Sequence, residues 1–322
     1  MEIFYSSCWT DRQPFFTVIT PIYNRRATIQ RTIDSVISQT FSDYEYIIID
    51  DGSSQSSDDI IFDFLNATNI PAMYVKKENG GVHTARNVGY KYARGKFVVC
   101  IDSDDELLPD ALSIFYNEYN LIPEETRSEY WQIKALCIDQ TGRLCSDKFP
   151  EEINLYDKDK AFKFFSMANG EQIGCRVANI MKNNPFPEPD GVKFVSENLL
   201  WLILEKKYKS WGSNKSACIY HTEGEDHLIK SNTKMSLQNC KNKLWESKYR
   251  IDNKNIFTNS LKKYLVALFK YCVFKHILKK KEKEFIKNNK LNSRSSRFVE
   301  KLLWIPSFIY SKIFYKKRCT GF

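Results

Sequence analysis

Short apolar runs alternate with amphipathic stretches through the first 120 residues of the chain. Four runs rich in β-branched and aromatic residues predict strands: FFTVIT (15–20), YEYIII (44–49), PAMYVKK (71–77) and GKFVVCID (95–102). Three stretches between them repeat apolar residues at helical spacing and predict helices: 27–39, 58–66 and 83–93. Pro109 is suited to the first turn of a further helix. This alternation predicts an α/β fold with a mostly parallel central sheet and helices on both of its faces.

The pattern from residue 131 onward is less regular. Two apolar runs on either side of the turn DQTGR predict a hairpin: WQIKALCI (131–138) and LCSDKF (144–149). Helices are expected near 157–168 and 196–208, and a strand at 216–221. The segment NNPFPEPDG (183–191) has three prolines and is typical of a loop.

A polar cluster follows each of the four predicted strands. In a parallel sheet, ligands bind beyond the carboxyl ends of the strands, so these clusters predict where the chemistry of the protein takes place. The clusters are PIYNRR (21–26), DDGSS (50–54), ENGGVHTARN (78–87) and DSDD (102–105).

The last cluster contains the closely spaced carboxylates Asp102, Asp104 and Asp105. Such carboxylates repel one another and raise each other's pKa unless a cation is present. Ligands that offer only oxygen favour Mg²⁺ or Mn²⁺, which bind through one or two carboxylates together with substrate phosphates. The alternative is a solvated acidic loop that caps the following helix.

Two other clusters could contact a nucleotide. Paired glycines stand before the helix that contains Arg86, and a guanidinium about one turn into that helix can reach a diphosphate with forked donors. The alternative is a turn and a surface arginine. Asp50 and Asp51 could accept hydrogen bonds from a base or a ribose, or could form an Asx turn or a helix N-cap.

Taken together, the motifs P-I-Y-N-R, I-D-D-G-S-S, N-x-G-x-x-x-A-R-N and I-D-S-D-D occur in an order and at a spacing that closely resemble the family 2 glycosyltransferases. That family has the GT-A fold and transfers a sugar with inversion at the anomeric carbon. The resemblance is strong over about residues 15–115, loose over 116–225 and absent beyond 225.

The resemblance implies roles for individual residues of the donor site. It places Pro21 and Tyr23 at the nucleotide, with Tyr23 beside the base and Asp51 hydrogen-bonded to that base. Arg86 would steady the diphosphate, and Asp102 would face the ribose or a metal-bound water.

The resemblance also implies a metal site and a catalytic base. Asp104 would ligate Mn²⁺ or Mg²⁺, and His221 would complete the metal shell, although His221 could equally face solvent. His227, with Glu225 and Asp226, is a weaker candidate. The family's base comes from a Glu-Asp pair just before a helix that contains L-W-L. Aligning SENLLWLIL (196–204) with that helix places Glu197 at the base position and Ser196 at the preceding acid.

That alignment leaves two alternatives open. A shift by one residue would put Asn198 at the base position, and an amide is not a useful proton acceptor. Glu197 could also be only an acidic residue in the first turn of a helix.

Charge is divided unevenly along the chain. The net charge is +9, but residues 241–322 contain 22 Lys/Arg and 5 Asp/Glu, which gives +17, so the other 240 residues carry −8. We therefore expect a GT-A glycosyltransferase domain at 1–240 and a basic, aromatic-rich helical extension at 241–322.

The basic extension predicts a polyanionic partner. Residues 261–281 suit a helix, and 298–318 combine lysines with aromatic residues, with Pro306 expected to interrupt any helix there. We predict peripheral membrane contact through 259–322. The alternatives are a helix packed on the core with a solvated lysine face, or nucleic-acid binding. Because no recognised nucleic-acid module is present, we expect no nucleic-acid partner.

Cysteine usage and hydropathy suggest a compartment. The nine cysteines are odd in number, widely spaced and free of C-x-x-C, which argues against a zinc ribbon or a disulfide scaffold. No uncharged apolar run reaches about 18 residues, and the first residues do not resemble a secretory signal. We expect a cytoplasmic protein that associates peripherally with the inner face of the cytoplasmic membrane.

These observations predict a metal-dependent inverting glycosyltransferase. It would move a sugar from a nucleotide-sugar, for which a UDP-sugar is expected, to a hydroxyl of a glycan or lipid-linked acceptor. One rival is a nucleotidyltransferase of related α/β fold, although PIYNRR is not the glycine-rich, lysine-bearing loop of that class. The other rival is a catalytically inactive glycosyltransferase-like scaffold.

Overall fold

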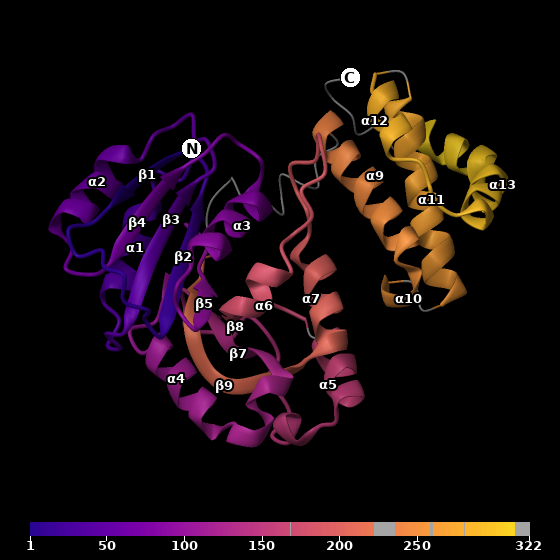
Figure 1. Cartoon of the computed structure of the whole chain (residues 1–322). Helices are drawn as coiled ribbons and strands as arrows, with labels where there is room; N and C mark the ends of the chain where they lie inside the picture. Colours follow the sequence, from indigo (N-terminus) through magenta and orange to yellow (C-terminus); the bar gives the residue numbers. More distant parts are fainter. Residues whose placement is uncertain (168, 222–235, 258–259, 280, 313–322) are drawn as a thin grey trace. The chain divides into compact units, whose positions relative to one another are not determined.

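The computed structural model describes residues 1–167, 169–221, 236–257, 260–279 and 281–312 (Figure 1). The chain forms two compact units. The first comprises Met1–Phe186 and Glu197–Thr222, and the second comprises Pro187–Ser196 and Glu223–Phe322.

The first unit is built on a nine-stranded sheet of order β1-β4-β3-β2-β5-β8-β7-β9-β6. The neighbours β4-β3-β2-β5 are parallel, as the alternating pattern predicts, while β8 is antiparallel to both β5 and β7. Strands β7 and β9 are parallel, and β1 and β6 are antiparallel edge strands. The strands are β1 (Glu2–Tyr5), β2 (Phe16–Ile22), β3 (Tyr44–Asp50), β4 (Ala72–Lys76), β5 (Phe97–Cys100), β6 (Glu106–Leu107), β7 (Tyr130–Asp139), β8 (Gln172–Val177) and β9 (Lys209–Tyr220).

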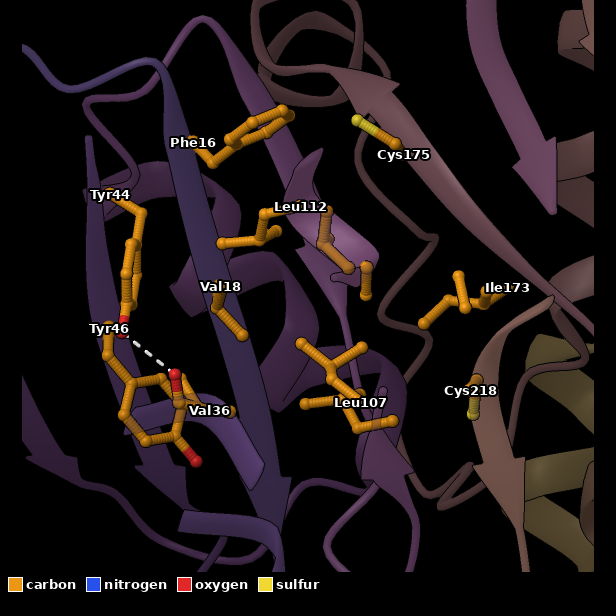
Figure 2. Close-up of a cluster of buried hydrophobic side chains, with 14 of the residues drawn as sticks. Phe16, Val18, Val36, Tyr44, Tyr46, Leu107, Leu112, Ile173, Cys175 and Cys218 are labelled. Atoms are coloured by element: carbon orange, nitrogen blue, oxygen red, sulfur yellow. Dashed lines mark hydrogen bonds between the residues drawn. The ribbon is translucent and has the colours of Figure 1, made fainter. Parts of the chain in front are cut away.

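Helices cover both faces of this sheet. Alternation along β2 sends Val18 toward the core that includes Leu112 (Figure 2) and Ile19 toward the helix on the other face. That helix packs closely because it presents Gly89, where an added Cβ would lie 2.6 Å from Ile19 Cγ2. The helices of the unit are α1 (Ile29–Ile37), α2 (Asp58–Ala67), α3 (Val82–Tyr92), α4 (Ala111–Leu121), α5 (Lys158–Phe165), α6 (Ala178–Asn183) and α7 (Glu197–Lys207), with 3₁₀ turns η1 (Glu124–Glu129) and η2 (Ile153–Leu155).

The hairpin expected at 131–138 and 144–149 forms at its turn, where the Cys145 N–H donates to the Cys137 carbonyl at 2.9 Å, but the strand expected over 144–149 is wrong. The first run forms β7, but 144–149 contributes only isolated bridges, Ile138 to Leu144 and Ser146 to Gly170. The antiparallel neighbour of β7 is β8. The sequence pattern did not reveal β8 because Gly174 and Arg176 interrupt its short apolar run.

The second unit contains helices α9 (Leu237–Asp252), α10 (Lys254–Phe257), α11 (Leu261–Leu278), α12 (Lys283–Asn288) and α13 (Arg294–Tyr310). These helices enclose an apolar core that includes Leu244 of α9 and Leu268 and Tyr271 of α11, and the Tyr271 hydroxyl donates to the Asn289 carbonyl at 2.9 Å. The basic segment is therefore a folded unit with a core of its own. Among the described residues, no helix is long and apolar enough to cross a membrane.

The expectation that Pro306 interrupts the last helix is also wrong, because Pro306 lies inside α13. The fixed φ of proline is compatible with a helix, and in this position the missing N–H removes a single bond near the carboxyl end. The neighbouring Ser307 hydroxyl donates to the Trp304 carbonyl at 2.9 Å. Contacts between α13 and α11, such as Phe269 with Tyr310, also favour continuation of the helix.

The central strands should dominate the stability of the first unit. Ile48 of β3 is fully buried in the core, and we expect Ile48→Ala to lower the free energy of unfolding by about 2–5 kcal/mol because it leaves a cavity. Ile37→Ala is the matched control, since Ile37 is 44% exposed, and it should change the free energy by about 0.5 kcal/mol or less. Urea denaturation followed by circular dichroism measures both. Equal losses for the two variants would contradict this description of the core.

Candidate active site

The four polar clusters gather at the carboxyl edge of β2, β3, β4 and β5, as the parallel topology predicts. Side chains from one loop hold the backbone of the next. Asn24 Oδ1, after β2, accepts from the backbone N–H groups of Ser54 and Gln55, after β3, at 2.8 and 3.0 Å. Thr28 donates to the Ser103 carbonyl, after β5, at 2.7 Å. The loops therefore form one connected rim.

Asp51 organises the loop between β4 and α3. It is 2% exposed, and its carboxylate accepts from Lys77 Nζ at 2.6 Å and from the backbone N–H groups of Gly80 and Gly81 at 2.9 and 2.7 Å. Asn79 Nδ2 also donates to it, at 3.2 Å. The amino end of α3, where an anion would be favoured, is thus occupied by a carboxylate of the protein itself. A role of Asp51 at a nucleotide base stays a prediction.

Three of the candidate residues meet around one guanidinium. Arg86 of α3 is 7% exposed and donates to Asp102 Oδ1, at the end of β5, at 2.7 Å. Its other terminal nitrogen donates to Glu197 Oε1 at the start of α7. Glu197 lies 111 residues from Arg86 in the chain, so the sequence could not reveal this contact.

This arrangement sets the charge of all three groups. Burial works against the charged form of Arg86, but Glu197 and Asp102 outweigh it and raise its pKa well above the ordinary value. Burial would also raise the pKa of Glu197, yet Arg86 and Arg176 hold it below its ordinary value. Burial raises the pKa of Asp102, with Arg86 opposing and Glu197 and Asp104 adding to the rise. Glu197 is therefore ionised and paired in this state.

Two further residues position Glu197. Trp201, one turn along α7, donates from Nε1 to Glu197 Oε2 at 3.1 Å. The guanidinium of Arg176 in β8 stacks on the Trp201 ring at 4.2 Å, and its buried Nε makes no hydrogen bond within the described part of the chain. Trp201 belongs to the L-W-L motif and could be found from sequence, whereas Arg176 is an isolated arginine in a strand that the pattern missed.

In the acidic loop after β5, one carboxylate is accessible to solvent and the next is buried in the protein. Asp104 is 27% exposed, with Oδ2 3.5 Å from Arg25 Nε. Asp105 is 6% exposed, and burial, together with the charge of Asp102, raises its pKa to about 8. His221 does reach this loop, but its backbone N–H donates to Asp105 at 2.9 Å and its Nε2 lies 2.6 Å from Glu106 Oε1. His227, Glu225 and Asp226 lie outside the described residues.

The carboxylates near this rim fit a divalent cation whose remaining ligands would be oxygens of substrate phosphates. Within the described ranges, no group of three or more His, Cys, Asp or Glu side chains could hold a metal alone. Mg²⁺ and Mn²⁺ need only one or two carboxylates when phosphates supply the other oxygens. Asp102 and Asp104 are 47 and 27% exposed and repel each other. Glu171, which the sequence did not single out, is a further carboxyl of this region, and burial together with the charges of Glu197 and Asp102 raises its pKa.

The remaining candidates lie at the end of β2. Pro21 is a buried strand residue in register with Ile49, so its contribution to a site would come from the backbone. Tyr23 is 46% exposed just beyond the strand, where its ring is accessible to a ligand.

Comparison with known proteins identifies relatives of the first unit. Residues 17–124 match the family model described as Glycosyl transferase family 2. A Campylobacter jejuni GalNAc(5)-diNAcBac-PP-undecaprenol β-1,3-glucosyltransferase is 31% identical over 228 residues, which cover 67% of each chain. A Bacillus subtilis protein that carries the name teichuronic acid biosynthesis glycosyltransferase TuaG is 36% identical over 66% of this chain and 80% of its own. The match to Streptococcus pneumoniae glycosyltransferase GlyA, 33% identical, covers 32% of this chain and only 14% of GlyA.

Solved structures share the fold at low sequence identity. Staphylococcus aureus TarS in complex with UDP-GlcNAc is 18% identical, with a TM-score of 0.54 over 92% of this chain and 81% of its own. The Pyrobaculum calidifontis mannosyltransferase PcManGT in complex with GDP-Man and Mn²⁺ is 13% identical, with a TM-score of 0.53 over 96% of this chain and 90% of its own. The predicted GT-A fold with a helical C-terminal part is confirmed.

Removal of the Arg86 guanidinium should lower the free energy of unfolding by an amount that depends on pH. In Arg86→Gln, Glu197 and Asp102 face each other without Arg86, and only Arg176 still offsets the charge of Glu197, so the pKa values of both carboxyls in the folded state should rise relative to wild type. The stability deficit relative to wild type should therefore grow as the pH increases from about 5 to 7. We expect a deficit of roughly 1–3 kcal/mol in the free energy of unfolding at pH 7. This is less than breaking a fully buried ion pair would cost, because Glu197 and Asp102 are 39 and 47% exposed.

Arg26→Gln is the control for this experiment, since Arg26 pairs with Asp59 at the solvent-exposed surface and its loss should change the free energy of unfolding little at either pH. Chemical denaturation at both pH values measures the deficit. A deficit in Arg86→Gln that shrinks with increasing pH would contradict the assigned pairing.

Proposed function

Because the chain belongs to glycosyl transferase family 2, we propose that it transfers a sugar from a UDP-sugar to a hydroxyl of a glycan or lipid-linked acceptor in bacterial surface-polysaccharide synthesis. The names of the C. jejuni and B. subtilis relatives support the acceptor class. The UDP-GlcNAc complex of TarS supports a uridine nucleotide as the donor. The sugar would be a hexose or a hexose derivative.

The observation that carries the proposal is the buried Arg86 guanidinium between Asp102 and Glu197. A diphosphate needs a cationic partner, and Asp51 already occupies the amino end of α3. Arg86 is then the group at the rim that would bind the diphosphate through two parallel N–H donors. Tyr23, exposed at the end of β2, would contact the base.

A divalent cation, Mn²⁺ or Mg²⁺, would be held by Asp104 with donor phosphates, and Asp102 would face a metal-bound water or the ribose. When bound, this metal would stabilise negative charge on the departing nucleoside diphosphate. His221 would join the metal shell through Nδ1 while its Nε2 stays paired with Glu106 at 2.6 Å, since a metal-bound histidine commonly donates its other ring N–H to a carboxylate. Arg25, beside Asp104, would restrain the loop that carries these carboxylates.

Glu197 would act as the general base on the acceptor hydroxyl, and a single such base is sufficient for transfer with inversion. A carboxylate paired with Arg86 is a weak base, because the guanidinium lowers its pKa. Binding of a diphosphate would attract Arg86 and weaken this pair. Trp201 would keep the Glu197 carboxylate in place meanwhile, since its Nε1 donates to the other oxygen.

One rival has an observation in its favour. The pairing of Glu197 with Arg86 is also what an inactive glycosyltransferase-like scaffold would show, since this ion pair keeps the candidate base from accepting a proton. A nucleotidyltransferase finds no comparable support in the rim. We further propose that the protein acts in the cytoplasm at the inner face of the membrane, in peripheral contact through 259–322 and without a nucleic-acid partner.

Replacement of the base should separate catalysis from donor binding. Glu197→Gln keeps the size and the Trp201 hydrogen bond but cannot accept a proton, so turnover should fall about 10²-fold or more. UDP-sugar affinity should not fall, because the variant removes the charge that competes with a diphosphate for Arg86. Glu124→Gln, at an exposed site in η1, is the control. Initial rates of UDP release with acceptor present, alongside donor titration, measure the two effects. Full activity of Glu197→Gln would assign the base to another residue.

Loss of the metal ligand should abolish the part of donor binding that depends on the metal. We expect UDP-sugars to raise the melting temperature of wild type more with Mn²⁺ than with chelator, because a ligand specific for the folded state stabilises it. Asp104→Ala should remove that Mn²⁺-dependent increase. Asp110→Ala, an exposed carboxylate at the start of α4, should retain it. An undiminished increase in Asp104→Ala would refute the assigned ligand.

A further inference from the structure

Helix α13 carries an exposed apolar stripe on the second unit. Phe298, Leu302, Ile305 and Ile309 are 64, 64, 69 and 52% exposed. Their spacing of four, three and four residues places them on one side of a helix. Side chains of this size at that spacing normally face a core, so the stripe indicates a partner outside the described structure.

Helix α11 extends this apolar surface. Leu261 and Val266 are 73 and 47% exposed, and they line a groove with Phe269, which contacts Tyr310 of α13 at a ring distance of 5.4 Å. The opposite side of α11 contributes Leu268 to the core of the unit. Leu303 and Tyr310 of α13 line the same groove, so both helices carry accessible apolar side chains; we call these side chains together with the stripe the α11/α13 face.

Every exposed charge on these two helices is positive. The acidic residue Glu300 of α13 is 12% exposed, and its carboxylate pairs with Lys275 Nζ at 2.6 Å, so it does not offset the surface charge. Lys262 and Lys270 border the groove itself. The exposed cations are Lys262, Lys263 and Lys270 on α11 and Arg294, Arg297 and Lys301 on α13.

From this combination we infer that the α11/α13 face binds the surface of an anionic lipid bilayer. Apolar side chains would enter the boundary between headgroups and acyl chains, and the lysines and arginines would contact anionic headgroups. This assigns to named residues the membrane contact included in the proposed function, on which it rests. No helix of the described ranges is suited to cross the bilayer, which agrees with binding parallel to its surface.

Other occupants fit this face less well. A second copy of the chain would bring two sets of exposed cations together, and like charges disfavour that contact. A nucleic acid would satisfy the cations but leave the Leu302 and Ile305 stripe in water. An anionic bilayer satisfies both features at once.

The test uses the full chain and sedimentation with vesicles. Wild type should bind vesicles that contain phosphatidylglycerol much more strongly than vesicles of phosphatidylcholine alone, at about 0.15 M salt. The double variant Leu302→Asp with Ile305→Asp should lose about tenfold or more in partitioning. Its control is Leu121→Asp with Leu155→Asp, which makes the same charge change at sites 63 and 85% exposed on the first unit.

A second pair of variants isolates the charge contribution. Lys262→Gln with Lys301→Gln should weaken binding to phosphatidylglycerol vesicles, whereas Lys148→Gln, at an exposed site of the first unit, should not. Point variants are preferable to deletion of 259–322, because Leu268 and Tyr271 of α11 belong to the core.

Three results would overturn the inference: no binding of wild type to phosphatidylglycerol vesicles, equal binding to both lipids, or a Leu302→Asp, Ile305→Asp variant that binds like its control. If that variant instead converts a dimer to a monomer without loss of lipid binding, the face is a contact between copies. Mn²⁺-dependent UDP-sugar binding by the same variants should stay unchanged, so failure of the membrane inference is distinguishable from failure of the proposed function.

Discussion

The bridge from Arg86 to Asp102 and Glu197 is the interaction on which the rest of the candidate site depends. It joins the amino half of α3, the carboxyl end of β5 and the start of α7 through one buried cation. Two carboxylates so close together would repel each other without that cation. Any ligand that binds Arg86 must therefore change the charge environment of both carboxylates, so the proposed donor binding would be coupled to the state of Glu197.

A second constraint is the occupation of the amino end of α3 by Asp51. Backbone N–H groups at Gly80 and Gly81 are a ready site for an anion, and here the protein fills it with its own carboxylate. The loop is held in place before a ligand arrives, with Lys77 contributing a further bond to Asp51. The loop is thus pre-organised, and the cation that we propose for a diphosphate is a side chain rather than a helix end.

The second unit forms an apolar core from a segment that is rich in lysine. Its core rests on α9 and α11, with residues such as Leu244 and Tyr271 buried. The lysines and arginines lie on the outside of α11 and α13, and apolar side chains such as Ile305 remain exposed beside them. The interpretation of a helix that packs on a core and has a solvated lysine face therefore applies to α11, and membrane contact through this segment stays a proposal.

The sequence by itself determined the parallel strands, the four polar loops and their common edge. Apolar strand runs and turn residues are local signals, and in a parallel sheet the loops that follow the strands lie at the same edge. The tertiary structure decided which groups touch. The 111-residue separation of Arg86 from Glu197, the stacking of Arg176 on Trp201, and the pairing of His221 with Glu106 have no local signature. It also decided β8, whose apolar run is broken by Gly174 and Arg176. Contacts between distant segments are set by packing, and packing energies depend on residues that no short stretch of the sequence contains.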